Sequence, residues 1–124
     1  MTKCVDVLSG GELVGSLTDP RLDMWYLEGA FSPLDTPKGM SFASTAAALD
    51  PRAAMSDPTR GIRVEIREHP NDVRMTFIVM ALSDGRLFGR CVFDPRAVAW
   101  TNQHVPATLI PRVNPPRRPW WRFW

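Results

Sequence analysis

The feature that most constrains the fold is a series of β-strand signals between residues 62 and 93. Apolar and charged side chains alternate strictly from Ile62 to Arg67, and this period of two is typical of a strand with one buried and one solvated face. An apolar-rich segment from Val73 to Leu82 predicts a second strand. Ser83-Asp84-Gly85-Arg86 then predicts a tight hairpin turn, because Asp-Gly fits the two positions of positive φ in a type I′ turn.

The turn at Asp84-Gly85 also predicts the register of this hairpin. Three pairs of residues should face one another on one side of the sheet: Leu82 and Leu87, Met80 and Gly89, and Ile78 and Cys91. The other side should carry Phe77, Val79, Ala81, Phe88 and Val92. Because both sides are mostly apolar, we expect this hairpin to be central and covered on each side. Arg90 falls among the apolar side chains of the second side, so it needs a partner or an opening to water.

The N-terminal part of the chain predicts three further strands. The segments from Cys4 to Leu8 and from Leu13 to Thr18 are β-prone, and Ser9-Gly10-Gly11-Glu12 between them is typical of a hairpin turn. Asp19-Pro20-Arg21 predicts a turn that ends the second strand. A third strand is predicted from Met24 to Phe31, with Trp25, Leu27 and Phe31 on one face.

Short helices are predicted in the central segment and after the last hairpin. The alanine-rich segment from Ser41 to Leu49 favours a helix with Ser41 as its cap. Asp-Pro-Arg occurs at Asp19, Asp50 and Asp94, and the related Asp-Pro-Thr-Arg begins at Asp57. Asp as cap followed by Pro is ordinary chemistry for the start of a helix, so we interpret the sequences at Asp50 and Asp94 as helical turns and not as a repeated anion-binding element.

Together these signals predict a mainly β fold, with an α+β fold as the alternative. The chain has 124 residues, 44% of them hydrophobic, which is enough for one buried core. We expect about six mainly antiparallel strands in a small barrel or half-sandwich, with one or two short helices. The β-rich globular domain is predicted to span residues 1–105, and an extended Pro/Arg/Trp-rich segment, called the arm below, residues 106–124.

The inventory of residues for catalysis or metal binding is small. The chain has two histidines, His69 and His104, and two cysteines, Cys4 and Cys91. HExxH, CxxC and GxSxG do not occur, and neither does a phosphate-binding glycine loop. We therefore expect no catalytic residues, no metal and no cofactor, and interpret both cysteines as buried thiols and His69 as a solvated loop residue.

Charge and aromatic residues are concentrated in the arm. All 13 acidic residues lie at or before Asp94, whereas the last thirty residues carry five arginines and no acid. Four large aromatic side chains fall in the last five positions, and side chains of this size need something to pack against. We predict that binding is carried by seven residues: Arg117, Arg118, Trp120, Trp121, Arg122, Phe123 and Trp124.

The run from Arg117 to Trp124 resembles the short Trp/Arg/Pro-rich antimicrobial peptides of the indolicidin and tritrpticin kind. The resemblance is one of composition. It implies an affinity for anionic interfaces, through arginine on phosphate and tryptophan at the level of the lipid headgroups.

A second resemblance concerns residues 6–33. Asp6–Leu17 followed by Asp23–Pro33 is similar to the opening of small uncharacterised bacterial proteins with the pattern G-x-x-x-G-x-L, then D-M-x-W, then G-x-F-x-P. Here Trp25 follows Met24 directly, without the intervening residue of that pattern. The resemblance implies a fold and a bacterial setting, and it supplies no active site.

These observations predict a protein that acts by binding. The first hypothesis is a non-enzymatic protein-interaction or accessory module, whose arm docks in a groove of its own dimer mate or of a partner protein. The alternative is binding of the arm to a membrane surface or to a polyanion such as single-stranded nucleic acid. A small enzyme of unknown reaction is the third hypothesis. The first residues lack the apolar stretch of a signal peptide, so the expected location is cytoplasmic.

Overall fold

The computed structural model describes residues 3–69 and 72–107 of the chain. All of the predicted arm beyond Ala107 lies outside the described residues, and so do the seven predicted binding residues, which are Arg117, Arg118, Trp120, Trp121, Arg122, Phe123 and Trp124. The described residues, called the body below, comprise nearly all of the predicted β-rich domain.

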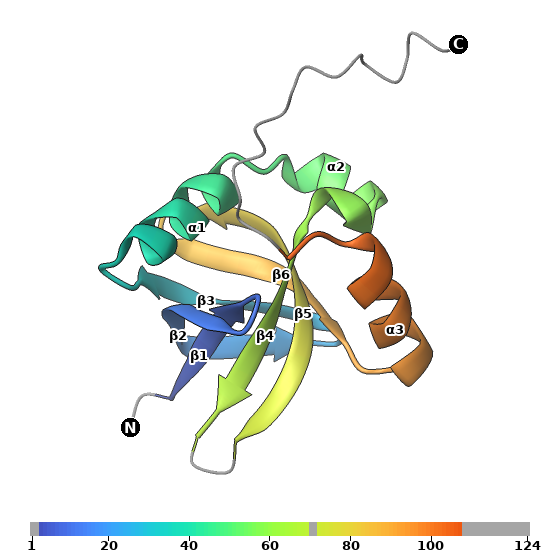
Figure 1. The fold of residues 1–124 in the computed structure, drawn as a ribbon, viewed down its shortest axis with the longest axis horizontal. Coiled ribbons are helices and arrows are strands. Elements are labelled where there is room, and N and C mark those ends of the chain that lie inside the picture. The colour runs from blue at the N-terminus through green and yellow to red at the C-terminus, as the bar shows by residue number, and fades with distance from the viewer. Residues whose placement is uncertain (1–2, 70–71, 108–124) are drawn as a thin grey trace, which may run out of the picture.

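Six antiparallel strands close into a barrel (Figure 1). The strands are β1 (Cys4–Ser9), β2 (Glu12–Asp23), β3 (Tyr26–Pro33), β4 (Ile62–Glu68), β5 (Val73–Ser83) and β6 (Arg86–Val92). Around the barrel they follow the order β1-β2-β3-β6-β5-β4, and β4 pairs with β1 to complete the closure. β4, β5 and β6 are joined by hairpins and β3 lies beside β6, which is Greek-key connectivity. The predicted antiparallel barrel is confirmed.

The helices lie in the two places that the sequence predicts. α1 (Pro37–Ala47), α2 (Pro51–Ser56) and the 3₁₀ turn η1 (Pro58–Arg60) connect β3 to β4, and α3 (Pro95–His104) follows β6. Each begins with a proline preceded by a capping side chain, which is Thr36, Asp50, Asp57 or Asp94. The interpretation of Asp50-Pro51 and Asp94-Pro95 as helix starts is confirmed.

The first helix begins earlier than the sequence predicts. Thr36 caps it by accepting the N–H of Gly39 at 3.0 Å, and Pro37 occupies its first turn, so the predicted cap Ser41 lies inside α1. The side chain of Phe42 is fully buried and packs on Phe31, with 5.5 Å between the ring centroids. α1 thus covers one part of the barrel interior with an aromatic side chain.

Asp19-Pro20-Arg21 does not end the second strand. β2 continues through it with a register shift between Thr18 and Arg21. Asp19 has a φ of 53°, and its N–H donates to the carbonyl of Lys3 at 2.8 Å. The Asp-Pro pair therefore forms a bulge, because the same residues that begin a helix also tolerate an irregular strand position.

The turn between β2 and β3 lies instead at Met24-Trp25. Met24 has a φ of 59°, and Asp23 pairs with Tyr26 across the hairpin. Leu27 and Phe31 are buried as expected. Trp25 was expected beside them on the strand, and this prediction is wrong because the turn places Trp25 outside the barrel, with 45% of its surface exposed.

The hairpin of β5 and β6 has the predicted turn but a different register. Asp84 and Gly85 have φ angles of 54° and 73°, and Leu82 pairs with Leu87 as predicted. A bulge between Val79 and Ala81 then shifts the pairing by one residue, so the two predicted pairs beyond it are wrong. The observed pairs are Val79 with Gly89, Ile78 with Arg90, and Phe77 with Cys91.

This bulge decides which side chains enter the barrel. Fifteen buried side chains form the core: Val5, Val7, Val14, Leu17, Leu27, Phe31, Phe42, Ala46, Ile62, Val64, Ile66, Phe77, Val79, Leu87 and Cys91. Ile78 and Val92 point outward and form a second cluster with Val105, against which Ala97 and Val98 of α3 pack. The hairpin is therefore covered on both faces, as the sequence predicts.

Candidate docking groove beside helix α3

α3 packs on the outer face of β5 and β6, where Ala97 and Val98 contact the cluster of Ile78, Val92 and Val105. At its start, Oδ1 of Asp94 accepts the N–H of Arg96 at 3.0 Å. At its end, the guanidinium of Arg63 donates to the carbonyl and side-chain oxygens of Asn102 at 3.0 and 2.9 Å. The N–H of Arg63 also donates to the carbonyl of Pro106 at 2.8 Å. The contacts of Arg63 therefore hold the C-terminal end of α3 against β4.

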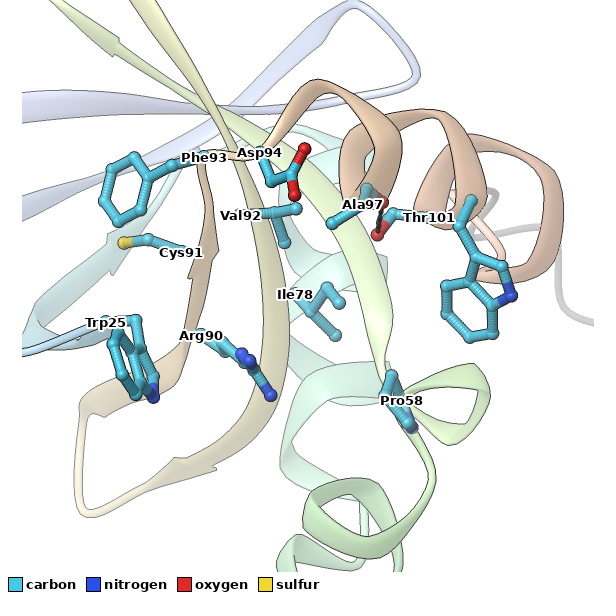
Figure 2. A pocket seen from close by; sticks show the side chains of 11 residues that line it. Trp25, Pro58, Ile78, Arg90, Cys91, Val92, Phe93, Asp94, Ala97 and Thr101 are labelled. Atoms are coloured by element: carbon cyan, nitrogen blue, oxygen red, sulfur yellow. Dashed lines mark hydrogen bonds between the residues drawn. The ribbon is translucent and has the colours of Figure 1, made fainter.

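A groove of about 430 Å³, called the α3 groove below, remains between α3 and β6. Figure 2 shows Ile78 and Val92 of the strands between Ala97 and Thr101 of the helix on one side and Trp25 and Arg90 on the other. Asp94 and Pro58 lie at opposite ends in this view. The full lining is Trp25, Pro58, Ile78, Arg90, Cys91, Val92, Phe93, Asp94, Ala97, Trp100 and Thr101.

Three aromatic side chains of the α3 groove are partly exposed. The turn that carries Trp25 is tied to β6, because the N–H of Cys91 donates to the carbonyl of Trp25 at 2.7 Å. Trp100 is 42% exposed and stacks on His104, with 4.7 Å between the ring centroids. Phe93 is 59% exposed and follows the end of β6. Exposed aromatic side chains gathered at one groove are typical of an interaction site.

Two charged groups, Arg90 and Asp94, line the α3 groove at separate places. Arg90 is exposed, so its expected opening to water is confirmed. None of the ion pairs within residues 3–69 and 72–107 involves Arg90 or Asp94. The groove therefore offers an apolar floor with a guanidinium and a carboxylate that make no ion pair within the described residues, and the second oxygen of the Asp94 carboxylate can meet a charged ligand.

The sequence did not predict the α3 groove as a site. Its residues come from the β2–β3 turn, from η1, from β5 and β6, and from α3, and no local pattern joins these segments. The one available signal was Arg90, whose place on an apolar strand face required a special environment. The predicted binding residues of the arm lie outside the described residues, so the structure does not place them beside any surface.

A second cluster of polar groups surrounds Asp6 on the outside of β1. Its Oδ2 accepts hydrogen bonds from Arg67 Nη2 at 2.8 Å and from His69 Nε2 at 2.6 Å. Burial raises the pKa of Asp6, but the hydrogen bonds and positive charges of His69 and Arg67 outweigh it, so that the pKa lies below its ordinary value. His69 is exposed, as expected, and it is also a partner of Asp6. Asp6 thus forms ion pairs with both Arg67 and His69, and we interpret this cluster as a structural one.

The two cysteines lie in different environments. Cys4 is exposed, so its interpretation as a buried thiol is wrong, because β1 begins at the rim of the barrel. Cys91 is buried in the core, and burial raises its pKa to about 11. Within the described part of the chain, no three His, Cys, Asp or Glu side chains lie together as a metal site would require.

No protein-family model, no curated protein and no solved structure matches the chain. Among the helices that the structure describes, none is long and apolar enough to cross a membrane. The cytoplasmic location and the bacterial setting stay predictions from the sequence.

Proposed function

We propose that this protein is a non-enzymatic interaction module, in which the α3 groove receives the Trp/Arg-rich arm of its dimer mate or the corresponding segment of a partner protein. The observation that carries this proposal is the apolar groove of about 430 Å³ with the partly exposed indoles of Trp25 and Trp100 at its sides. Proline-rich extended segments bind in aromatic-lined grooves of this kind, because such segments lose little entropy on docking.

The dimensions and chemistry of the groove suit an aromatic side chain. Its volume of about 430 Å³ lies within the range of about 300–1,000 Å³ that is common for ligand pockets. Ile78 and Val92 form its floor and are themselves buried, and the partly exposed indoles of Trp25 and Trp100 offer faces for stacking. Tryptophan and arginine, which dominate the arm, are the residue types that contribute most to binding at protein interfaces.

The charges of body and arm are complementary. Residues 1–107 contain 11 basic and 13 acidic side chains, a net charge of −2, whereas residues 108–124 contain four arginines and no acid. Attraction between the two parts favours encounter and correct orientation more than final affinity. It therefore supports docking of the arm on a body of this composition.

The body offers little support for the alternative of a membrane or polyanion partner. Such partners are bound by a continuous basic surface. Five of the described basic side chains are paired with carboxylates, namely Lys3, Lys38, Arg67, Arg74 and Arg86. A protein partner is the function that these observations favour.

The proposal is tested by quenching of tryptophan fluorescence with acrylamide in the full chain. Ala97→Lys places a cation in the α3 groove, and its flexible stem can extend to water without disturbing the helix. Gln103→Lys makes the same charge change at an exposed position of α3 and is the matched control. We expect Ala97→Lys to raise the quenching of the arm tryptophans, and Gln103→Lys to leave the quenching as in the unaltered protein.

Trp25 and Trp100 of the body also fluoresce, so the quenching of their fluorescence must be separated from that of the arm tryptophans. The triple variant Trp120→Ser, Trp121→Ser, Trp124→Ser leaves only the two body tryptophans, and in this background Ala97→Lys should change the quenching little. Equal quenching of the arm tryptophans with and without Ala97→Lys would show that the α3 groove does not shelter them. Binding to phosphatidylserine vesicles or an oligonucleotide that falls steeply with salt and ignores Ala97→Lys would support the alternative.

A further inference from the structure

We infer that the occupant of the α3 groove is the arm of a second copy of this chain, so that two copies exchange their arms reciprocally. This inference rests on the proposed function and names its partner. It follows from three features of the described body: where the chain leaves it, how far the groove lies from that point, and how charge is placed along the groove.

The chain leaves the body on the flank of α3 that faces away from the α3 groove. The carbonyl of Ala107 accepts the hydroxyl of Ser9 at 2.8 Å. Ala107 lines a separate cavity together with Val98 and Asn102, whereas the α3 groove is lined by Ala97, Trp100 and Thr101. To enter its own groove, an arm would have to pass from this flank of α3 to the other.

The length of the arm allows it to reach a second copy. Trp100 precedes Ala107 by seven residues, so the chain places them at most about 25 Å apart. Trp120 follows Ala107 by 13 residues, and a segment of that length spans at most about 45 Å. The arm is therefore long enough to carry its tryptophans beyond the surface of its own copy to the groove of a neighbour.

The two charges of the α3 groove set the direction in which an arm enters. The carboxylate of Asp94 at one end attracts arginine, which binds carboxylates through paired hydrogen bonds. Arg90 carries the same sign as the arm and repels arginine from its part of the groove. Arg118 and Arg122 flank Trp120 and Trp121 in the sequence. The favoured arrangement places one of these arginines at Asp94 and an indole over Ile78 and Val92.

A reciprocal exchange produces a closed dimer. Each copy supplies one arm and one groove, so the interface has twofold symmetry and no binding site is left to recruit a third copy. Once the first arm is docked, the second binds within the same complex at a high effective concentration. Two modest docking events can therefore give one stable dimer.

Complementation between two full-chain variants tests the exchange. Ala97→Lys blocks the groove but keeps the arm, and the triple variant Trp120→Ser, Trp121→Ser, Trp124→Ser keeps the groove but removes the indoles. Light scattering during gel filtration should give a mass of twice 14.0 kDa for the unaltered chain and for the control Gln103→Lys. Each variant alone should be monomeric at the same concentration. An equimolar mixture should form dimers of one copy of each, because one groove and one arm remain intact, and these dimers should be weaker than the unaltered dimer because only one of the two docking contacts is left.

Two outcomes would overturn the exchange and would still keep the α3 groove as the place where the arm tryptophans dock. An unaltered chain that is monomeric, with arm tryptophans that Ala97→Lys exposes, would show docking within one copy. A dimer that survives both variants, with the same exposure of the tryptophans by Ala97→Lys, would show that the copies meet through another surface. A monomer whose arm tryptophans are equally quenched in every variant would overturn both proposals. Circular dichroism of each variant confirms that the barrel is folded.

Discussion

Oδ2 of Asp6 on β1 accepts a hydrogen bond from Nε2 of His69 at 2.6 Å, across 63 positions of the sequence. The same oxygen accepts from Arg67 on β4 at 2.8 Å. These contacts lie where β1 and β4 pair through only three residue pairs to close the barrel. Asp6 therefore reinforces the shortest junction of the sheet.

We predict that Asp6→Asn lowers the free energy of unfolding at pH 5 by about 1–2 kcal/mol, because it removes the charge from a partly buried network of hydrogen bonds. The pKa of Asp6 lies below its ordinary value in the folded protein, because the hydrogen bonds and charges of His69 and Arg67 outweigh the effect of burial. The stabilisation is therefore fully present above the unfolded pKa and is lost as the pH falls through the folded pKa. Urea unfolding at pH 5 and at pH 3 measures the free energy of unfolding of the unaltered protein and of Asp6→Asn. The difference between these two free energies should be smaller at pH 3 than at pH 5. Asp72→Asn, at an exposed pair with Arg74, is the control and should have little effect.

Gly89 is predicted to be intolerant of any side chain. A Cβ at this position would collide with the carbonyl oxygen of Ile78 and would lie 2.6 Å from the ring of Phe77. Both contacts belong to the central hairpin, which cannot move apart without breaking its pairing. Gly89→Ala should therefore lower the free energy of unfolding by about 1–3 kcal/mol, the usual cost of overpacking.

Urea unfolding monitored by circular dichroism measures this loss. Gly10→Asn is the control, because nothing lies within 4 Å of a Cβ there and asparagine tolerates the φ of 57°. An equal loss in both variants would show that the close approach at Gly89 is not the cause.

Local patterns predicted the strands well but not the irregularities between them. The alternation at Ile62–Arg67 and the turn at Asp84-Gly85 are properties of neighbouring residues, and both are confirmed. The bulge at Met80 has no such signature, because Met80 is apolar like its neighbours and suits either side of the sheet. One inserted residue reverses the faces of every side chain beyond it, so the predicted partners of Met80 and Ile78 were wrong.

The same limit explains why the groove could not be predicted. Trp25 looks like a core strand residue, but the positive φ of Met24 places it in the turn, so the third strand begins at Tyr26, two residues later than predicted. Trp100 and Arg90 lie ten residues apart in the sequence, and they border one groove only because α3 folds back over β6. Contacts of this kind depend on the path of the whole chain, which local periodicity does not record.

The two cysteines should react at different rates with thiol reagents, because one is exposed and the other is buried. Cys4 is exposed, whereas Cys91 is buried with a pKa of about 11, so little of its thiol is ionised at pH 8. We expect a disulfide reagent such as Ellman's reagent to modify one thiol per native chain and two after unfolding in guanidinium. Cys4→Ser should abolish the native reaction. Rapid native reaction of Cys4→Ser would contradict the placement of Cys91 in the core.

Asp94 has two roles that substitution can separate. Its Oδ1 caps α3, and its carboxylate supplies negative charge at one end of the α3 groove. Asparagine caps helices about as well as aspartate, whereas alanine does not. Asp94→Asn should therefore preserve the thermal stability and weaken dimer formation about two- to fivefold for each groove, the usual size of an exposed ion pair.

Asp94→Ala should weaken dimer formation to a similar degree and should also lower the free energy of unfolding by about 1 kcal/mol. Sedimentation equilibrium measures the first effect and urea unfolding the second. A dimer equally stable with asparagine at position 94 would show that arginine of the arm does not meet this carboxylate, and the arm would then enter the groove in some other direction.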